Sequence, residues 1–340
     1  MLQVPVVDFS PFLADEGMNV GAQPTEGQES AAKQLGAACR DHGFVCLKGC
    51  GGEELAEAVG DAFSFSKQLF EMSDEEKARL RVHQPKPNTG FSAFAKEKLN
   101  RDRGWDLKET FNIRRSSFTD DGFFDGCPEG FEKASRRLWQ ALEAAAKRYC
   151  RQCALALNLE DDFFSKHFQK WDMVTLRFLH YPPVDYEGPL DSSKAIRIGE
   201  HTDFGMFTFL FIENAGSTES RGLQAKPVQG GMAESSGSGN GWIDVECTEG
   251  CVVNTGALLA RWTNDEWRAT AHRVVVPNSE VAKGHRYTIA CFFDPDEDAV
   301  IAVDQRFGEP KYKPITSGDY LTARLREAYG VPDAPSETAN

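Results

Sequence analysis

The stretch that decides the fold reads EHTDFGMFTFLF and covers residues 200–211. It is apolar on both faces, as a buried strand would be, yet it carries a histidine and an aspartate two residues apart. In an extended chain, alternation places His201 and Asp203 on the same face as Phe207 and Phe209. An unpaired carboxylate buried there costs on the order of several kcal/mol. Asp203 therefore needs a partner, and a metal ion is one such partner.

A third candidate ligand lies in a distant stretch that reads ARWTNDEWRATAHRVVVP. Its strand-like run AHRVVV places His272 on one face with Val274 and Val276. Two histidines and one carboxylate, with two ligands at i and i+2 and the third on another strand, match the facial triad that holds non-haem Fe(II). Short His-x-Asp matches are also common by chance, so a structural role for these residues stays open on spacing alone.

Two further strand-like stretches carry a possible carboxylate receptor. In GHRYTIACFFDP, alternation aligns Arg286, Thr288 and Phe292, and a buried guanidinium beside a hydroxyl suits a carboxylate ligand. In TLRFLHYPP, the same alternation puts Arg177 and Tyr181 on one side. Taken singly, Arg286 also fits a salt bridge at a sheet edge, and Tyr181 also fits the end of a strand.

The composition narrows the class of partner. The chain has 340 residues and a formal net charge of -14, whereas nucleic-acid and anionic-membrane surfaces need clustered lysine and arginine. We therefore expect no nucleic acid and no membrane as partners, and a small molecule as the substrate. The residues leave the oligomeric state open.

The cysteines and the amino terminus bear on the compartment. The nine cysteines are odd in number and lie in predicted helices and strands, as reduced thiols do. The start MLQVPVVDFSPFL has neither a basic beginning nor a long apolar run, so we expect no signal peptide or membrane anchor. The protein is expected to be cytoplasmic.

Along the chain the pattern is α+β and rich in β-structure. Helical periodicity covers ESAAKQLGAACRDH, EELAEAVGDAFSFSKQLFEM, residues 131–159, DDFFSKHF and the tail SGDYLTARLREAYG. Short strands broken by Gly, Pro, Asn and Asp run from MVTLRFLHYPP to about ACFFDPDED, as in an antiparallel sandwich or barrel. A Gly- and Ser-rich insertion near residues 229–241 is expected to be a hairpin loop, with a substrate lid as the alternative.

The motif order RFLHYPP, GEHTDFG, GLQAK, GWIDV, NTGALLARWTNDEWRATAHRVV and HRYTIACFF resembles the isopenicillin N synthase-like branch of the Fe(II)- and 2-oxoglutarate-dependent dioxygenases. The early motifs VPVVDFS, DHGFVCLKG and DLKETFNI extend the likeness over nearly the whole chain. The resemblance implies a double-stranded β-helix, or jelly roll, flanked by helices. It also implies His201, Asp203 and His272 as iron ligands, with Arg286 and Thr288 holding the distal carboxylate of 2-oxoglutarate beside Tyr181.

The resemblance further implies one catalytic domain over residues 1–340. Its expected parts are a mixed amino-terminal region at 1–115, a jelly-roll core at 172–296, and a carboxy-terminal helix and tail at 316–340. The implied reaction uses Fe(II), 2-oxoglutarate and O₂ to oxidise, most simply to hydroxylate, a small molecule, with release of succinate and CO₂. The alternatives are an isopenicillin N synthase-like oxidase or cyclase that needs no 2-oxoglutarate, and an inactive binding protein of the same fold.

Substrate contacts are expected from side chains that share faces with these residues. The candidates are Arg177, Phe204, Phe292 and, at the pocket mouth, Phe94. Two departures from the family pattern stand out. Thr288 replaces a serine and keeps the hydroxyl, while Leu179 replaces an asparagine that contacts the cosubstrate in many plant members. The stretch LLARWTNDEWRATAHRVV is more similar to microbial and fungal members, such as thymine hydroxylase, than to plant enzymes.

Overall fold

Two antiparallel-rich sheets face each other in the computed structural model, which describes residues 4–13, 22–84, 88–96, 106–183, 196–213, 222–226, 241–247, 250–276 and 284–329. The large sheet runs in the order β1 (Val6–Asp8), β2 (Phe44–Lys48), β10 (Cys251–Thr255), β7 (Phe207–Ile212), β12 (Arg286–Phe293), β5 (Thr175–Tyr181), β4 (Glu109–Ile113) and β3 (Gly90–Ser92). The small sheet runs in the order β6 (Ile196–His201), β11 (His272–Val275), β8 (Leu223–Ala225) and β9 (Ile243–Asp244). The expected α+β jelly roll is confirmed.

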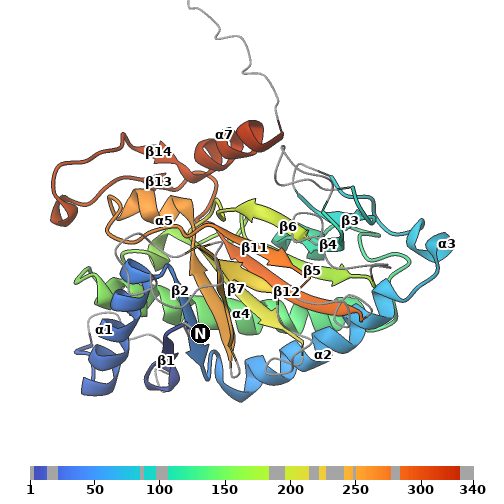
Figure 1. The fold of residues 1–340 in the computed structure, drawn as a ribbon, viewed down its shortest axis with the longest axis horizontal. Helices are drawn as coiled ribbons and strands as arrows, with labels where there is room; N and C mark the ends of the chain where they lie inside the picture. Colours follow the sequence, from blue (N-terminus) through green and yellow to red (C-terminus); the bar gives the residue numbers. More distant parts are fainter. Residues whose placement is uncertain are drawn as a thin grey trace, which may run out of the picture.

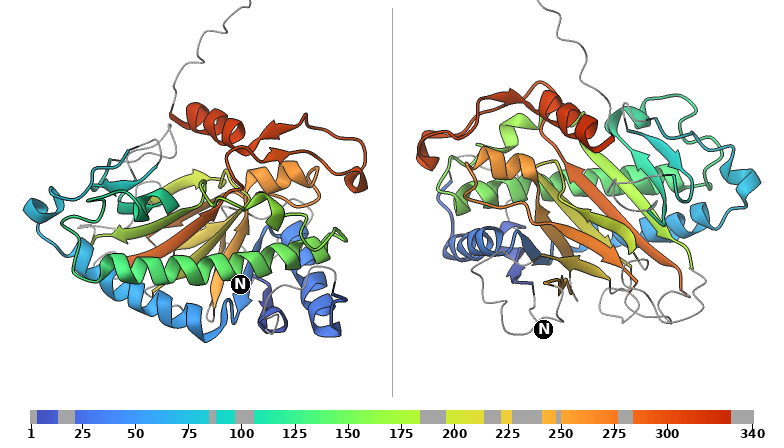
Figure 2. Two further views of the ribbon diagram at one scale, coloured as in Figure 1. Left: turned by 180° about the vertical axis from the view of Figure 1, so that it is seen from behind. Right: turned by 45° about the horizontal axis from the view of Figure 1, so that its top comes forward.

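Three helices cover the outer face of the large sheet (Figure 1). They are α1 (Glu26–Asp41), α2 (Gly52–Phe70) and α4 (Phe131–Ala156). Figure 2, left, shows α4 and α2 side by side across the sheet. Each helix buries one apolar stripe, because leucines, alanines and aromatic residues recur at helical spacing and pack onto the strands. This layer forms the main hydrophobic core and leaves the other face of the sheet for the space between the two sheets.

The space between the two sheets holds a second, smaller apolar cluster. Both sheets contribute to it, with Phe44, Leu179, Tyr181, Val252 and Ala290 from the large sheet and Ile198, Leu223 and Val274 from the small one. Apolar walls of this kind exclude water from any polar group that points between the sheets.

The stretch 200–211 is two strands in two different sheets, so the expectation of one extended strand is wrong. β6 ends at His201 and β7 begins at Phe207. The chain turns at Gly205, where a Cβ atom would lie 1.8 Å from Oδ1 of Asp294. The backbone N–H of Leu258 donates to the carbonyls of Phe204 and Gly205, which fixes the turn against α5 (Ala257–Trp262). Alternation along one strand therefore does not explain how His201 and Asp203 meet.

The carboxy-terminal part lies over one end of the sheets. It comprises β13 (Val300–Ile301), β14 (Ile315–Thr316) and α7 (Ser317–Tyr329), which Figure 1 shows together at the top. Earlier in the chain, α3 (Asp74–Lys77) is a single turn. The helix expected over DDFFSKHF is reduced to a short 3-10 turn at Ser165–His167. The Gly- and Ser-rich insertion, apart from Gly241, and the tail beyond Tyr329 lie outside the described residues.

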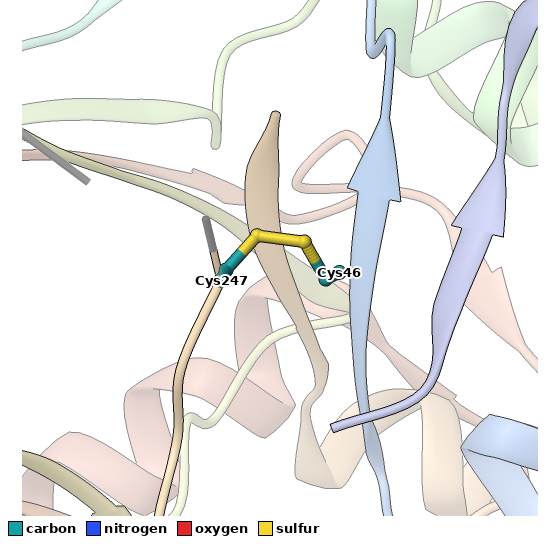
Figure 3. Close-up of a disulfide and its surroundings, with 2 residues drawn as sticks. All are labelled: Cys46 and Cys247. Carbon is teal, nitrogen blue, oxygen red and sulfur yellow. A yellow bond between two sulfur atoms is a disulfide. The ribbon is translucent and has the colours of Figure 1, made fainter. Parts of the chain in front are cut away.

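The expectation of nine reduced cysteines is wrong for one pair. Cys46 on β2 and Cys247, which follows β9, form a disulfide (Figure 3). It lies within the apolar cluster between the sheets and therefore links the large sheet covalently to the end of the small one. The other seven cysteines are free thiols, and six of them are buried. Burial raises the pKa of Cys150 and of Cys153, so this closely spaced pair has the character of structural, unreactive thiols.

No helix among the described residues is long and apolar enough to cross a membrane.

Candidate functional site

The backbone brings three candidate ligands together at one end of the small sheet. His201 is the last residue of β6 and stands directly opposite His272, the first residue of β11. Asp203 follows two residues after β6, inside the turn. Oδ1 of Asp203 lies 3.7 Å from Nε2 of His201 and 3.6 Å from Nε2 of His272. One ligand atom of each residue lies within 4.8 Å of the others, and among the described residues no other such group could hold a metal ion.

Backbone carbonyls fix the tautomer of both histidines. Nδ1 of His201 lies 2.8 Å from the carbonyl oxygen of Gly199, and Nδ1 of His272 lies 3.1 Å from that of Thr270. A carbonyl only accepts a hydrogen bond, so each Nδ1 is the donor and each Nε2 keeps its lone pair toward Asp203. Burial, together with His272, lowers the pKa of His201 well below its usual range. Its imidazole is therefore neutral at pH 7, as a metal ligand must be.

Two neutral donors orient the carboxylate. Oδ2 of Asp203 accepts hydrogen bonds from the Thr208 hydroxyl at 2.5 Å and from the Asn254 amide at 2.7 Å, which leaves Oδ1 facing the histidines. Burial alone would raise the pKa of Asp203, but the two histidines and these two donors together hold it below its usual value. The site thus offers two neutral imidazole nitrogens and one charged oxygen. This donor set fits a two-histidine, one-carboxylate Fe(II) site with open coordination positions.

A buried cation lies between the sheets at the carboxyl end of β5. Arg286 stands opposite Tyr181 and Thr288 opposite Leu179 in the pairing of β12 with β5. Arg286 is only 5% exposed, and within the described part of the chain no partner meets hydrogen-bond geometry with its three guanidinium nitrogens or with the Thr288 hydroxyl. The guanidinium carbon lies 4.8 Å from the centre of the Tyr181 ring. Burial lowers the pKa of Arg286, and the Tyr181 phenol partly offsets this effect. A buried cation of this kind calls for an anionic ligand.

Of the four residues expected to contact the substrate, Arg177, Phe204 and Phe292 each lie beside another described side chain, whereas Phe94 lies at the surface. The Arg177 guanidinium lies 5.5 Å from the centre of the Phe292 ring, and its Nε donates to Oδ1 of Asn112 at 2.9 Å. Phe204 follows Asp203 and is covered by Arg324 of α7 at 5.1 Å. Phe94, in contrast, is 43% exposed, and among the described residues the structure does not bring it into contact with the others.

Several residues of the site were not found from the sequence. Asn254 lies in the buried strand CVVNT, where a lone amide among apolar residues indicates that its side chain has a hydrogen-bonding role. Thr208 lies in an apolar strand and gives no such signal. Arg197, buried on β6 close to Arg286, could not have been placed because its neighbour belongs to the other sheet.

Known families match both halves of the chain. The sequence profile described as the N-terminal region of a non-haem dioxygenase in morphine synthesis matches residues 4–128, and that of the 2OG-Fe(II) oxygenase superfamily matches residues 171–295. The 2-oxoglutarate-Fe(II) type oxidoreductase hxnY of Emericella nidulans is 28% identical over 353 residues, which span 97% of this chain and 91% of hxnY. The proline hydroxylase buaE of Petromyces alliaceus is 28% identical over 352 residues, covering 96% of this chain and 100% of buaE.

A solved structure gives the same result for the fold. The Neurospora crassa thymine hydroxylase with bound 2-oxoglutarate is 30% identical, with a TM-score of 0.75 and 95% of each chain covered. With 2-oxoglutarate and thymine bound, the identity is 28% and the TM-score 0.76, with 96% of this chain and 97% of the other covered. These likenesses extend over the helices and both sheets, because the covered share is nearly the whole chain.

Proposed function

The chain belongs to the 2OG-Fe(II) oxygenase superfamily and is a 2-oxoglutarate-dependent dioxygenase, and from this premise we propose that His201, Asp203 and His272 are its iron ligands. The observation that carries the proposal is the convergence of their ligand atoms within 4.8 Å. Both Nδ1 atoms and the second Asp203 oxygen already have hydrogen-bond partners, so the remaining donor atoms are free for one ion.

Each group of side chains has a distinct task in this reaction. Bound Fe(II) supplies the O₂ chemistry that couples decarboxylation of 2-oxoglutarate, to succinate and CO₂, to oxidation of the substrate. Arg286 and Thr288 bind the distal carboxylate of 2-oxoglutarate beside Tyr181, because their polar atoms are buried and find no hydrogen-bond partner among the residues that the structure describes. The apolar walls between the sheets exclude water, so that the substrate is the group that is oxidised.

The substrate is a small molecule that is flat, anionic or both, and the outcome is hydroxylation. Phe204 and Phe292 provide rings for stacking, and Arg177 beside Phe292 provides a cation. The thymine complex of the Neurospora crassa relative supports a flat heterocycle as the first class to screen. Phe94 remains a candidate at the pocket mouth, where its 43% exposure would let it meet an entering ligand.

The remaining expectations are also part of the proposal. Residues 1–340 act as one catalytic domain, with an amino-terminal region at 1–115, a core at 172–296 and a carboxy-terminal part at 316–340. The pairing of β2 with β10 supports this unity, because the amino-terminal region completes the large sheet. We infer that the protein works in the cytoplasm, without nucleic acid or a membrane as partner. Seven free thiols support that compartment and the Cys46–Cys247 disulfide weighs against it, which cell fractionation would decide.

The test measures metal binding and turnover in the same variants. We expect Asp203→Ala and His272→Ala to abolish succinate formation from 2-oxoglutarate, and to weaken Fe(II) binding measured anaerobically, while the far-ultraviolet circular dichroism stays unchanged. Asp298→Ala is the matched control, because this carboxylate is 71% exposed and pairs with Lys170 at the surface. Full activity in either ligand variant would overturn the assignment of the triad.

A further inference from the structure

A second buried arginine lies close to Arg286. Arg197 is on β6, four residues before His201, and its guanidinium reaches the ring of Tyr181 on β5 of the facing sheet. Arg197 is 1% exposed. Its guanidinium carbon lies 5.6 Å from the centre of the Tyr181 ring, and that of Arg286 lies 4.8 Å from the same ring. The two sheets therefore direct two buried cations at one phenol.

No carboxylate of the described residues neutralises either cation. Within those residues Nε of Arg197 has no hydrogen-bond partner, and its Nη2 makes a long contact of 3.5 Å to the carbonyl oxygen of Gly284. Among the described residues, no carboxylate lies within ion-pair distance of Arg197 or Arg286. The buried carboxylate of Asp106, which is close to β6, is paired with Lys108 at 3.1 Å.

Two like charges buried side by side are unfavourable without an anion between them. Burial, with Arg286 nearby, lowers the pKa of Arg197 to about 10, so the Arg197 guanidinium is still charged at pH 7. Guanidinium groups in proteins stay protonated, so Arg286 adds a second positive charge. The fold keeps this arrangement although it lowers stability. Binding of a negatively charged ligand to these two arginines is the simplest physical reason why the fold keeps both of them buried.

We propose that Arg197 is a second binding residue for 2-oxoglutarate, and that its distal carboxylate lies between Arg197 and the Arg286–Thr288 pair. A carboxylate has two oxygens and about four acceptor sites, so it can receive hydrogen bonds from both sheets at once. This inference rests on the function proposed above. It assigns the cosubstrate a contact with each sheet of the jelly roll.

The location of Arg197 favours the cosubstrate over the oxidised substrate. The cation on the substrate side is Arg177, which contacts Phe292. Arg177 lies four residues before Tyr181 on β5, or about 13 Å along an extended strand. Arg197 groups with Tyr181 and Arg286, at the opposite end of that strand.

The test compares 2-oxoglutarate with 2-oxopentanoate, which has the same chain length but a methyl group in place of the distal carboxylate. Titration calorimetry is done anaerobically on the Fe(II)-loaded protein. We expect Arg197→Gln to weaken 2-oxoglutarate binding by about 10- to 100-fold, the usual effect of losing a charge-assisted hydrogen bond, and to leave 2-oxopentanoate binding nearly unchanged. Arg197→Lys should recover part of the loss.

Two further readouts separate a binding role from a structural one. The melting temperature of metal-free Arg197→Gln should equal or exceed that of the wild type, because an unpaired buried charge is removed, while the increase on adding 2-oxoglutarate should shrink. Arg40→Gln, which changes an exposed arginine paired with Glu266, should match the wild type in every measurement.

Each other outcome overturns the inference in a recognisable way. Unchanged 2-oxoglutarate affinity in Arg197→Gln with a raised KM for the substrate would assign Arg197 to the substrate. An equal loss for both oxo acids, or a lowered melting temperature without ligand, would assign it a structural role. Failure of the wild type itself to bind 2-oxoglutarate would instead contradict the proposed function.

Discussion

Asn254 and Thr208 decide which oxygen of Asp203 faces the two histidines. Both donate to Oδ2, at 2.7 and 2.5 Å, so that Oδ1 is the oxygen left for a metal ion. Groups that orient a ligand in this way typically contribute 10- to 100-fold to metal affinity. The site is therefore held by at least five side chains, of which the sequence pattern indicated three.

We predict that Asn254→Ala weakens Fe(II) binding by about 10-fold or more, because the Asp203 carboxylate is then free to rotate. Thr208→Val, which removes the other donor at nearly constant volume, should have a similar effect, and the double variant a larger one. Anaerobic competition with a chromophoric chelator measures the affinity. Wild-type affinity in the double variant would show that Asp203 does not depend on these donors.

Asp294 has the most unusual environment of any described carboxylate near the turn at Gly205. Its Oδ1 atom has no hydrogen-bond partner. Burial raises its pKa from 3.8 to about 7, against the attraction of Arg114. Between these two pH values, the folded protein keeps a proton that the unfolded chain has lost. The contribution of Asp294 to the free energy of unfolding is therefore fully present below pH 3.8 and is lost as the pH rises toward 7.

We predict that Asp294→Asn removes this pH dependence. Relative to the variant, the free energy of unfolding of the metal-free wild type should fall by about 1.4 kcal/mol per pH unit across this window. Urea denaturation at several pH values between 4 and 7 measures the difference. Parallel pH profiles for the two proteins would mean that Asp294 is ionised in the folded state.

At the scale of elements, α7 brings the carboxy-terminal part of the chain to the turn that follows Asp203. Arg324 lies 5.1 Å from the centre of the ring of Phe204, the residue after Asp203, and also pairs with Glu327 at 3.1 Å. The sequence indicated a terminal helix on the outside of the β core. The structure adds that one side chain of this helix covers an aromatic residue proposed to contact the substrate.

We predict that Arg324→Ala raises the KM for the oxidised substrate by about 2- to 5-fold, the range expected for one exposed cation–π contact. The KM for 2-oxoglutarate should not change, because the side chain that the structure describes beside Arg286 is Tyr181 of β5, whereas Arg324 lies beside Phe204. Arg326→Ala, which alters an exposed residue of the same helix, is the control. If Arg324→Ala and Arg326→Ala raise the KM for the substrate equally, the effect comes from the loss of positive charge on α7 and not from the contact of Arg324 with Phe204.

The elements also show where sequence reasoning succeeds. β12 is long, buried and paired on both sides, so strict alternation places Arg286, Thr288 and Ala290 on one face, as predicted. Alternation fails as a guide at residues 202–206, where the turn depends on Gly205 packing against Asp294, the residue that follows β12. Arg197 escaped notice for the same reason: its significance depends on Arg286 in the facing sheet. Contacts between sheets are not encoded in the period of either strand.

At the scale of the whole molecule, one covalent link joins the two sheets. The Cys46–Cys247 disulfide closes a loop with a sequence separation of 201 residues, which greatly restricts the unfolded chain. The sequence did not indicate this pair, because nine cysteines allow many pairings and none stands out by spacing.

We predict that reducing this disulfide lowers the free energy of unfolding by about 2–4 kcal/mol. Urea denaturation with and without a reducing agent measures the change, and thiol titration of the denatured protein should rise from seven to nine groups. Cys247→Ala should be insensitive to the reducing agent, whereas Cys127→Ala, which alters a free thiol, should behave as the wild type. Nine thiols without reduction would contradict the disulfide.

The strand order of the large sheet has a consequence for synthesis. β12 lies between β7 and β5 and pairs with both, yet it is the last strand of that sheet to leave the ribosome. Until residue 293 has emerged, β5 and β7 have no common neighbour, and each keeps an open edge. β12 also carries Arg286 and Thr288, so the nascent chain acquires the receptor proposed for 2-oxoglutarate in the same step that closes the sheet. A nascent chain that ends before β12 would lack these two residues and could not bind the cosubstrate. Closure of the large sheet and binding of 2-oxoglutarate would therefore become possible at the same point of synthesis.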